Sequence, residues 1–250
     1  MNKNERLNIF SEELSLIKNP EYKLLLEKIL EEAPTYFFDM PASTSGKYHP
    51  PLSLGPGGLI RHTKVVAKIM IMLSNLKMFD FTDSEKDLLL IAAIAHDMIK
   101  KGDNKTGHTV DDHPQFAVRF LKKCLDELDI PYEYDTTTDI ERYLLFSVET
   151  HMGQWGERLP KTEAEKLLHI CDYLAAQKCF EYKFTEEEYN KTVPKTETLT
   201  MTFGKYKGKT LQEVKNVDLD YLLWCNDTKL DVKGANEMIN KFLTEEKLIK

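Results

Sequence analysis

The sequence predicts a mainly α-helical protein, a helical bundle followed by a small α+β module. Apolar residues recur at helical spacing from about residue 4 to residue 176, and proline, glycine and polar clusters separate the runs. Past residue 198, two short extended segments flank a glycine-rich turn, a pattern typical of a hairpin. We therefore predict a helical domain over residues 1–184, a linker over 185–198 and a module over 199–250.

Two short helices are expected at the N-terminus, over residues 4–18 and 21–32. Asn19-Pro20 separates them, because proline fits the first turn of a helix but not its interior. Residues 39–58 are rich in proline and glycine, so we predict a long loop there. Long ordered loops in compact domains are often functional, and this one leads directly into the next helix.

The other helices of the first domain are predicted from apolar periodicity and capping signals. They are expected over residues 59–77, 83–98, 113–128, 139–150 and from 163 onward. Thr162 and Glu165 form a capping-box pattern before the last of these helices. The stretch 88–95 is almost continuously apolar, so its helix is expected at the centre of the bundle.

In the C-terminal module, residues 199–203 and 210–211 are predicted to pair as a short β-hairpin, with helices over 219–225 and 236–247. Three lysines surround Tyr206 at the turn. This tip is either a basic surface that stacks a nucleobase or simply a charged turn.

Composition indicates a soluble globular protein, because 42% of the residues are apolar and 30% are charged. The formal net charge of −7 argues against tight, sequence-independent binding of nucleic acid, although a local groove could still hold a substrate. The four cysteines contain no Cys-x-x-Cys pair, so neither a zinc ribbon nor a disulfide framework is expected. The polar N-terminus, and the lack of a run of about 18 apolar residues, predict a cytoplasmic protein that does not span a membrane.

Six residues of metal-binding type lie on or next to the predicted helices. Imidazole suits ions such as Zn, Mn, Fe or Ni, and carboxylate suits Mg, Ca or Mn. Helices that converge on one point could bring all six together, as in metal sites inside helical bundles. Four of the chain's seven histidines belong to this set, which consists of His62, His96, Asp97, His113, His151 and Asp172.

The order His…His-Asp…His…His…Asp resembles the HD superfamily of metal-dependent phosphohydrolases. The resemblance covers about residues 36–180 and is closest to the HD domain of YhaM-type 3′→5′ exoribonucleases. Its motifs are GGLIRHT at 57–63, AAIAHDMIK at 92–100, HMG at 151–153 and EAEKLLHICDYLA at 163–175. The segment FGKYKGKTLQEV at 203–214 is similar to a small module of exodeoxyribonuclease X-like enzymes and phage proteins, which implies a phage or bacterial origin.

The resemblance implies a site for one or two divalent cations, which could be Mn, Mg, Fe, Ni or Zn. The ligands of the first ion would be His62, His96, Asp97 and Asp172. His113 and His151 would hold a second ion bridged by Asp97, or would contact the phosphate or act as an acid if only one ion binds. Many two-metal members have paired histidines where this chain has His151-Met152, so both arrangements stay open.

Further residues are expected to act on the substrate. The catalytic residues would be Asp97, Lys100, His113 and His151, and the substrate-binding residues would be Lys100, His49, Lys47 and Arg61. Lys100 would offer an ammonium group to a phosphate oxygen, and His49 and Lys47 lie in the long loop before the first ligand.

The function that these patterns imply is metal-dependent hydrolysis of a phosphoester or phosphodiester by an activated water molecule. We expect a nucleotide or the end of a single-stranded nucleic acid as the substrate. The subgroup resemblance favours an exonuclease, whereas the acidic charge and the absence of an N-terminal OB-type RNA-binding domain favour small nucleotides. The alternative is a non-catalytic HD-fold binding or adaptor protein that uses its C-terminal module to contact protein or DNA.

Overall fold

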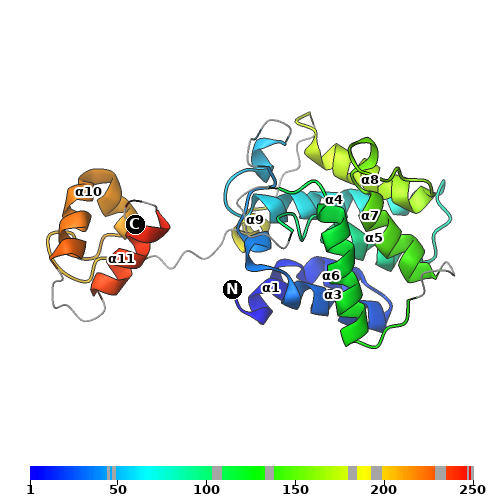
Figure 1. The fold of residues 1–250 in the computed structure, drawn as a ribbon, viewed down its shortest axis with the longest axis horizontal. Coiled ribbons are helices and arrows are strands. Elements are labelled where there is room, and N and C mark those ends of the chain that lie inside the picture. Colours follow the sequence, from blue (N-terminus) through cyan, green and yellow to red (C-terminus); the bar gives the residue numbers. More distant parts are fainter. Residues whose placement is uncertain are drawn as a thin grey trace. The chain divides into compact units, whose positions relative to one another are not determined.

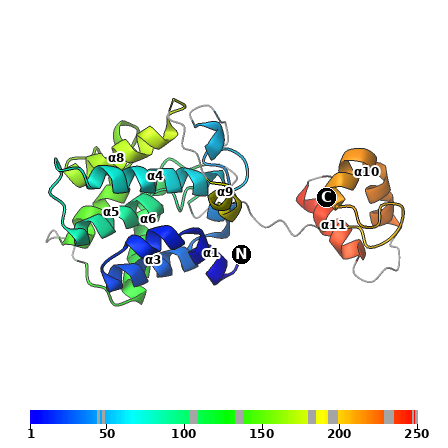
Figure 2. The ribbon, with the colours of Figure 1, turned by 180° about the vertical axis from the view of Figure 1, so that it is seen from behind.

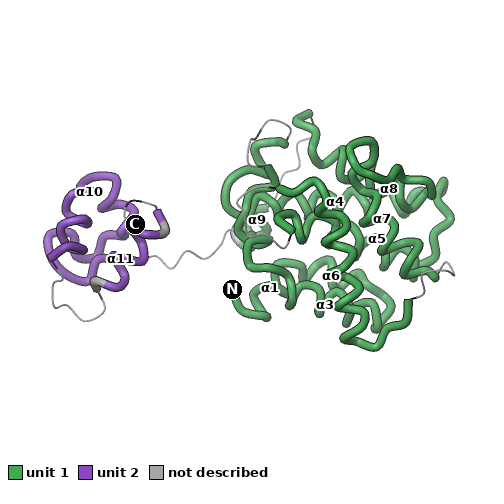
Figure 3. The backbone as a smooth tube through the Cα atoms, in the orientation of Figure 1, with its two compact units in different colours: residues 1–194 green, residues 195–250 purple. Residues whose placement is uncertain are grey.

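The computed structural model describes residues 1–43, 46, 49–102, 109–132, 138–179, 185–192, 199–228, 235–246 and 248. The chain forms two compact units, residues 1–194 and residues 195–250, each with its own hydrophobic core (Figure 3). The described part of both units is mainly helical, as the sequence predicts for unit 1. Among the described residues, no helix is both long enough and apolar enough to cross a lipid bilayer.

Unit 1 is built from α-helices joined by short 3-10 and π-helical segments (Figure 1). The α-helices are α1 (Lys3–Ile9), α2 (Ser11–Leu16), α3 (Pro20–Glu32), α4 (Gly58–Ser74), α5 (Asp83–Ala95), α6 (His113–Glu127), α7 (Phe146–Thr150), α8 (Glu163–Ala176) and α9 (Glu186–Thr192). The shorter elements are η1 (Thr35–Phe38), η2 (Pro51–Ser53), η3 (Ile140–Leu145) and η4 (Gly153–Trp155).

Helices α4 and α5 form the centre of unit 1. Helix α4 lies between α5 and α8 and contacts both (Figures 1 and 2). Helix α5 is buried from Asp87 to Ala95, which confirms the central position expected for its continuous apolar stretch. The C-terminal end of α5 therefore lies deep in the unit, where the ends of neighbouring helices can reach it.

Local sequence explains how these helices begin and end. The Thr82 hydroxyl accepts the N–H of Glu85, and the Glu85 carboxylate accepts the N–H of Thr82, so a capping box starts α5. The helix predicted over residues 4–18 is divided in the structure at Phe10, whose N–H donates to the carbonyl of Leu7. The break directs the fully buried Phe10 ring into the core, so the burial of one aromatic side chain overrides the continuous helical period.

Part of the predicted linker is helical and packs on unit 1. Helix α9 contacts α1 and α4, and a carboxylate oxygen of Glu188 lies 2.6 Å from Nζ of Lys68 in α4. The guanidinium of Arg61 lies 5.0 Å from the ring centroid of Tyr189. The structure differs from the linker prediction over residues 186–192 because this ion pair and this cation–π contact hold the segment against α4.

Unit 2 contains α10 (Leu211–Asp227) and α11 (Ala235–Glu245), which contact each other. Helix α10 begins earlier than the predicted helix over 219–225, and it contains a kink at Asp218, whose backbone is not helical. The core of the unit consists of Met201, Leu211, Val214, Leu222, Cys225, Ile239 and Leu243.

The predicted β-hairpin is absent from the described residues 199–211. The backbone forms one isolated antiparallel bridge there, between Thr200 and Thr210. Gly204 and Gly208 adopt left-handed φ angles of 71° and 87°. The N–H of Met201 donates to the carbonyl of Lys209 and the N–H of Leu211 donates to the carbonyl of Leu199, but the paired stretch is too short to form strands. The two glycines lie in the turn between the segments, where a left-handed backbone favours glycine.

Candidate metal centre

Side chains from five helices or helix ends converge inside unit 1. They are His62 in α4, His96 and Asp97 just after α5, His113 at the start of α6, His151 just after α7 and Asp172 in α8. The four histidines and Asp97 are buried, whereas 22% of the Asp172 side chain is exposed. The structure thus brings together all six residues that the sequence predicts as metal ligands.

Asp97 lies between two groups of imidazoles. Its Oδ2 atom is 3.8 Å from Nε2 of His62 and 3.6 Å from Nε2 of His96. Its Oδ1 atom is 3.0 Å from Nε2 of His113 and 3.7 Å from Nε2 of His151. Each carboxylate oxygen therefore faces a different pair of histidines, which is the arrangement required of a carboxylate that bridges two cations.

Asp172 completes the first of these groups. Its Oδ1 atom lies 3.0 Å from Nε2 of His62 and 3.7 Å from Nε2 of His96. His62, His96 and Asp172 each offer a ligand atom within 4.8 Å of the others, and so do His96, Asp97 and His151. Two overlapping sets of possible ligands thus share His96.

Backbone carbonyls define the tautomers of three of the histidines. The Nδ1 atoms of His96, His113 and His151 lie 2.9, 2.8 and 2.7 Å from the carbonyl oxygen of the residue three positions earlier. A carbonyl oxygen can only accept a hydrogen bond, so each Nδ1 carries the proton. In the neutral ring, Nε2 is then unprotonated and available as a ligand, as in metal sites whose histidines donate their other N–H to a carbonyl.

This donor set fits a divalent cation. Nε2 of His96 is buried and has no hydrogen-bond partner among the described residues. Nε2 of His113 lies 3.1 Å from Nε2 of His151, so these two ring nitrogens converge on the same point. Buried polar atoms without partners are costly, and a bound cation would satisfy these nitrogens together with the carboxylates.

The charges in the centre keep both carboxylates ionised. Burial opposes ionisation of Asp97, but Lys100 and His96 hold the pKa of its carboxyl well below the usual value. Burial likewise opposes ionisation of Asp172, but the hydrogen bond with His62 and the nearby imidazole of His96 hold the pKa of its carboxyl well below the usual value. Burial lowers the pKa of His151, which favours its neutral form. Anionic carboxylates beside a neutral imidazole are the protonation states that a metal ligand set needs.

Two of the predicted substrate-binding residues lie next to the centre. Nζ of Lys100 is 2.5 Å from Oδ2 of Asp97, so this ammonium group offsets the buried carboxylate charge. The ring centroid of His49 lies 5.1 Å from that of His62, and burial, with His62 and Lys100 adding to it, lowers the His49 pKa to about 4. Lys47 lies outside the described residues.

Arg61 was predicted to bind substrate, and the structure places its side chain elsewhere. The guanidinium is buried and donates to the carbonyl oxygens of Leu52 and Leu54, at 2.7 and 2.9 Å. A third donor reaches the Thr192 hydroxyl at 3.4 Å. Arg61 lies on a different face of α4 from its neighbour His62. Its side chain therefore connects the loop and α9 to α4 and does not point into the centre.

The sequence analysis did not identify the groups that orient the histidines. The carbonyls of Ala93, Val110 and Val148 carry no side-chain signal, although each stands three residues before a candidate ligand at a helix end. His169 is a further supporting residue, because its Nδ1 atom lies 2.8 Å from the carbonyl oxygen of His151. The three carbonyl contacts share one sequence pattern: the carbonyl belongs to the residue three positions before a histidine at a helix end.

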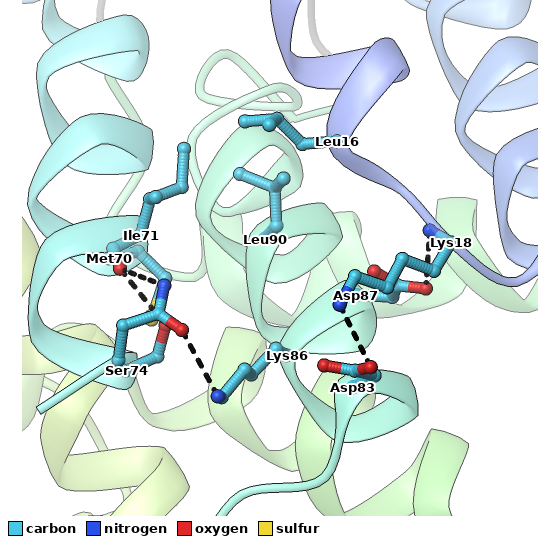
Figure 4. Close-up of a pocket in the computed structure, with 10 residues that line it drawn as sticks. Leu16, Lys18, Met70, Ile71, Ser74, Asp83, Lys86, Asp87 and Leu90 are labelled. Carbon is cyan, nitrogen blue, oxygen red and sulfur yellow. Dashed lines mark hydrogen bonds and ion pairs between the residues drawn. The ribbon is translucent and has the colours of Figure 1, made fainter. Parts of the chain in front are cut away.

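A separate pocket of about 170 Å³ lies between α4, α5 and the segment after α2 (Figure 4). Its polar groups bind one another. The Asp87 carboxylate accepts the backbone N–H of Lys18, Nζ of Lys18 lies 2.8 Å from Asp83, and Nζ of Lys86 donates to Asn75. These contacts join α5 to the N-terminal segment and give the pocket a structural role.

Comparisons with known families match both parts of the chain. Residues 59–177 match the model of the HD domain, a range that contains all six candidate ligands. Residues 201–227 match the model of the exodeoxyribonuclease X-like C-terminal domain. No solved structure matches the chain. The family matches confirm the two resemblances that the sequence motifs indicate.

Proposed function

We propose that this HD-domain protein is a metal-dependent phosphohydrolase that cleaves a phosphoester of a nucleotide or of a single-stranded nucleic-acid end. HD domains bind divalent metals, and the family generally consists of metal-dependent hydrolases. The observation that carries the proposal is the position of Asp97, whose two oxygens face two separate pairs of imidazoles.

The proposed centre holds two ions. The first would be held by His62, His96, Asp97 and Asp172, and the second by Asp97, His113 and His151. The chemistry that the ions supply when bound is Lewis acidity, which lowers the pKa of a water molecule toward neutrality. Met152 stands where a further histidine would be expected, so the second group offers fewer protein ligands and leaves room for substrate oxygens.

The chain's own residues would position and neutralise the phosphate. Lys100 already lies against Asp97 and would place a positive charge beside a phosphate oxygen. His49 is half-buried beside His62, and its Nδ1 atom has no hydrogen-bond partner among the described residues. In its neutral form this ring can donate one hydrogen bond to a phosphate oxygen without adding charge.

Two features support a nucleotide or nucleic-acid substrate. The C-terminal match is to the exodeoxyribonuclease X-like C-terminal domain, and an exodeoxyribonuclease acts on the ends of DNA strands. The net charge of −7 opposes tight binding to a long phosphate backbone and favours recognition of a single nucleotide or of a chain end. The substrate class therefore includes nucleotides and short single strands.

The test is hydrolysis in Mn²⁺ of a panel of nucleoside phosphates, cyclic nucleotides and end-labelled single-stranded RNA and DNA. Wild-type protein is compared with Asp97→Asn and with Asp111→Asn, a matched change at an exposed carboxylate. We expect turnover by the wild type and by Asp111→Asn only. Full turnover by a folded Asp97→Asn protein would exclude the metal mechanism. Stoichiometric metal without hydrolysis of any phosphoester would favour a binding or adaptor protein instead.

A further inference from the structure

Three rings cluster on the surface of unit 1 beside the metal centre: Trp155, His169 and Tyr173. The Trp155 and Tyr173 rings are stacked, with centroids 6.1 Å apart and an interplanar angle of 14°. Trp155 is 60% exposed and Tyr173 is 44% exposed. Large aromatic side chains are mostly buried in soluble proteins, so a stacked and exposed pair indicates a surface that binds something.

The cluster is attached to the candidate ligands at two points. The Nδ1 atom of His169 lies 2.8 Å from the carbonyl oxygen of His151, and the His169 ring lies 6.1 Å from the ring of Trp155. Tyr173 directly follows Asp172 in α8, and consecutive Cα atoms are about 3.8 Å apart. The aromatic surface is therefore a direct neighbour of the metal centre.

Around α8, His169 lies about 60° and Tyr173 about 100° from Asp172, on the solvent-facing side of the helix. At about 100° per residue, Asp172, His169 and Tyr173 lie roughly 100°, 160° and 200° from the buried Cys171 in one direction around the helix. Ile170 lies in the opposite direction. Among the six candidate ligands, Asp172 has the most exposed side chain, so solvent reaches the centre on the same side as the rings.

The backbone beneath Trp155 is ordered by local contacts. The N–H of Trp155 donates to the carbonyl of Met152, and the N–H of Gly156 donates to the carbonyl of Gly153. Gly153 has a φ of +57°, and a Cβ atom there would lie 2.2 Å from Cε1 of His169. Glycine thus lets the turn pack against His169, so the backbone that carries Trp155 is ordered in the absence of a ligand, which lowers the entropy lost on binding.

We infer that Trp155, supported by Tyr173, is a stacking surface for the nucleobase of the nucleotide whose phosphate enters the metal centre. Every nucleobase has a π face, so such a surface accepts any base. It discriminates against substrates that carry no base. The inference rests on the proposed function, because it takes the metal centre as the place where the phosphate is held. It adds that the substrate carries a base and that Trp155 sets this preference.

The experiment measures binding by full-length protein in EDTA, so that turnover does not interfere. One probe is a short fluorescein-labelled oligothymidylate, and the other is the same oligonucleotide with an abasic 3′-terminal residue. The variants are Trp155→Ala, the conservative Trp155→Phe, and Trp224→Ala as a matched control. Trp224 is also exposed, at 52%, but belongs to unit 2. Circular dichroism checks that each variant is folded.

We expect Trp155→Ala to weaken binding of the base-bearing probe about tenfold or more, while Trp155→Phe and Trp224→Ala keep near wild-type affinity. Binding of the abasic probe should be weaker for wild type and should not change further in Trp155→Ala. Equal affinities of wild type and Trp155→Ala for the base-bearing probe would overturn the inference. A loss confined to Trp224→Ala would also overturn it and would place the stacking surface in unit 2.

A hydrolysis assay in Mn²⁺ separates this inference from the proposed function. If Trp155→Ala binds weakly and the wild type hydrolyses nothing, the stacking surface stands and the proposed function fails. If the wild type hydrolyses base-bearing and abasic substrates equally well and Trp155→Ala does the same, the proposed function stands and the stacking surface fails.

Discussion

Nε2 of His113 lies 3.1 Å from Nε2 of His151, and each ring donates its Nδ1–H to a backbone carbonyl. In their neutral forms, with Nδ1 protonated, the two rings would direct their Nε2 lone pairs at each other inside a buried site. Both nitrogens also face Oδ1 of Asp97. Such a convergence of acceptors is unfavourable without a positive charge among them, so a cation should have a large effect on this centre.

We expect two divalent ions per chain in the wild type and one in His113→Ala. Removing one imidazole leaves Asp97 and His151 as the only predicted protein ligands of the second ion, while the first group keeps all of its ligands. Metal content after dialysis against Mn²⁺ measures this. Two ions in a folded His113→Ala protein would contradict the assignment of His113, and His108→Ala, at a histidine outside the predicted set, is the control.

Metal should stabilise unit 1 strongly. A ligand that binds only the folded state contributes about 2.7 kcal/mol at 100 times its Kd. For a chain of this size, that free energy raises Tm by roughly 5 to 10 °C. Thermal unfolding with Mn²⁺ and with EDTA measures the shift, and Asp97→Asn should abolish most of it. An equal shift in Asp97→Asn would place the stabilising ion elsewhere.

Arg61→Met should reduce stability and leave substrate binding intact. The guanidinium donates to the carbonyls of Leu52 and Leu54, and each hydrogen bond to a charged group contributes about 1.5–3 kcal/mol. Urea unfolding should therefore show a loss of about 3–6 kcal/mol, while KM stays within about twofold of the wild type because Arg61 does not point into the centre. A large increase in KM without loss of stability would restore the substrate-binding role.

The docking of α9 should weaken in acid. The hydrogen bond from Lys68 lowers the pKa of Glu188 to about 2, below the unfolded value of about 4.3. A depressed carboxyl pKa contributes stability that is fully present above the unfolded pKa and is lost as the pH falls through the folded pKa. The stability advantage of wild type over Glu188→Gln should thus be constant near neutrality and shrink from about pH 4 toward pH 2.

Urea unfolding of both proteins at several pH values measures this difference. Glu187→Gln is the matched control, because Glu187 stands on the same helix with a largely exposed side chain. A difference between wild type and Glu188→Gln that does not change with pH would show that the Glu188–Lys68 pair does not hold α9.

The sequence predicted those parts of the fold that depend on local patterns of residues. The helix α5 was foreseen from its continuous apolar run, which is a local pattern, whereas the Thr82–Glu85 capping box that starts it was not predicted. The β-hairpin is not found among the described residues, because the two predicted segments pair only around the isolated bridge between Thr200 and Thr210 and form no strands. Arg61 was misassigned because a charged residue beside a candidate ligand looks the same in a sequence whether it faces substrate or carbonyl oxygens.

The sequence by itself determined which residue types were available and in what order: four histidines and two aspartates at or near helix ends, and an HD-domain pattern around them. Helix periodicity and ligand chemistry are local properties, so they can be read along the chain. The tertiary structure alone decided that Asp97 faces one imidazole pair with each oxygen, and that Trp155 stacks on Tyr173 beside Asp172. These relations join residues far apart in sequence, and they depend on how α4 to α8 pack around one buried point, which no local pattern specifies.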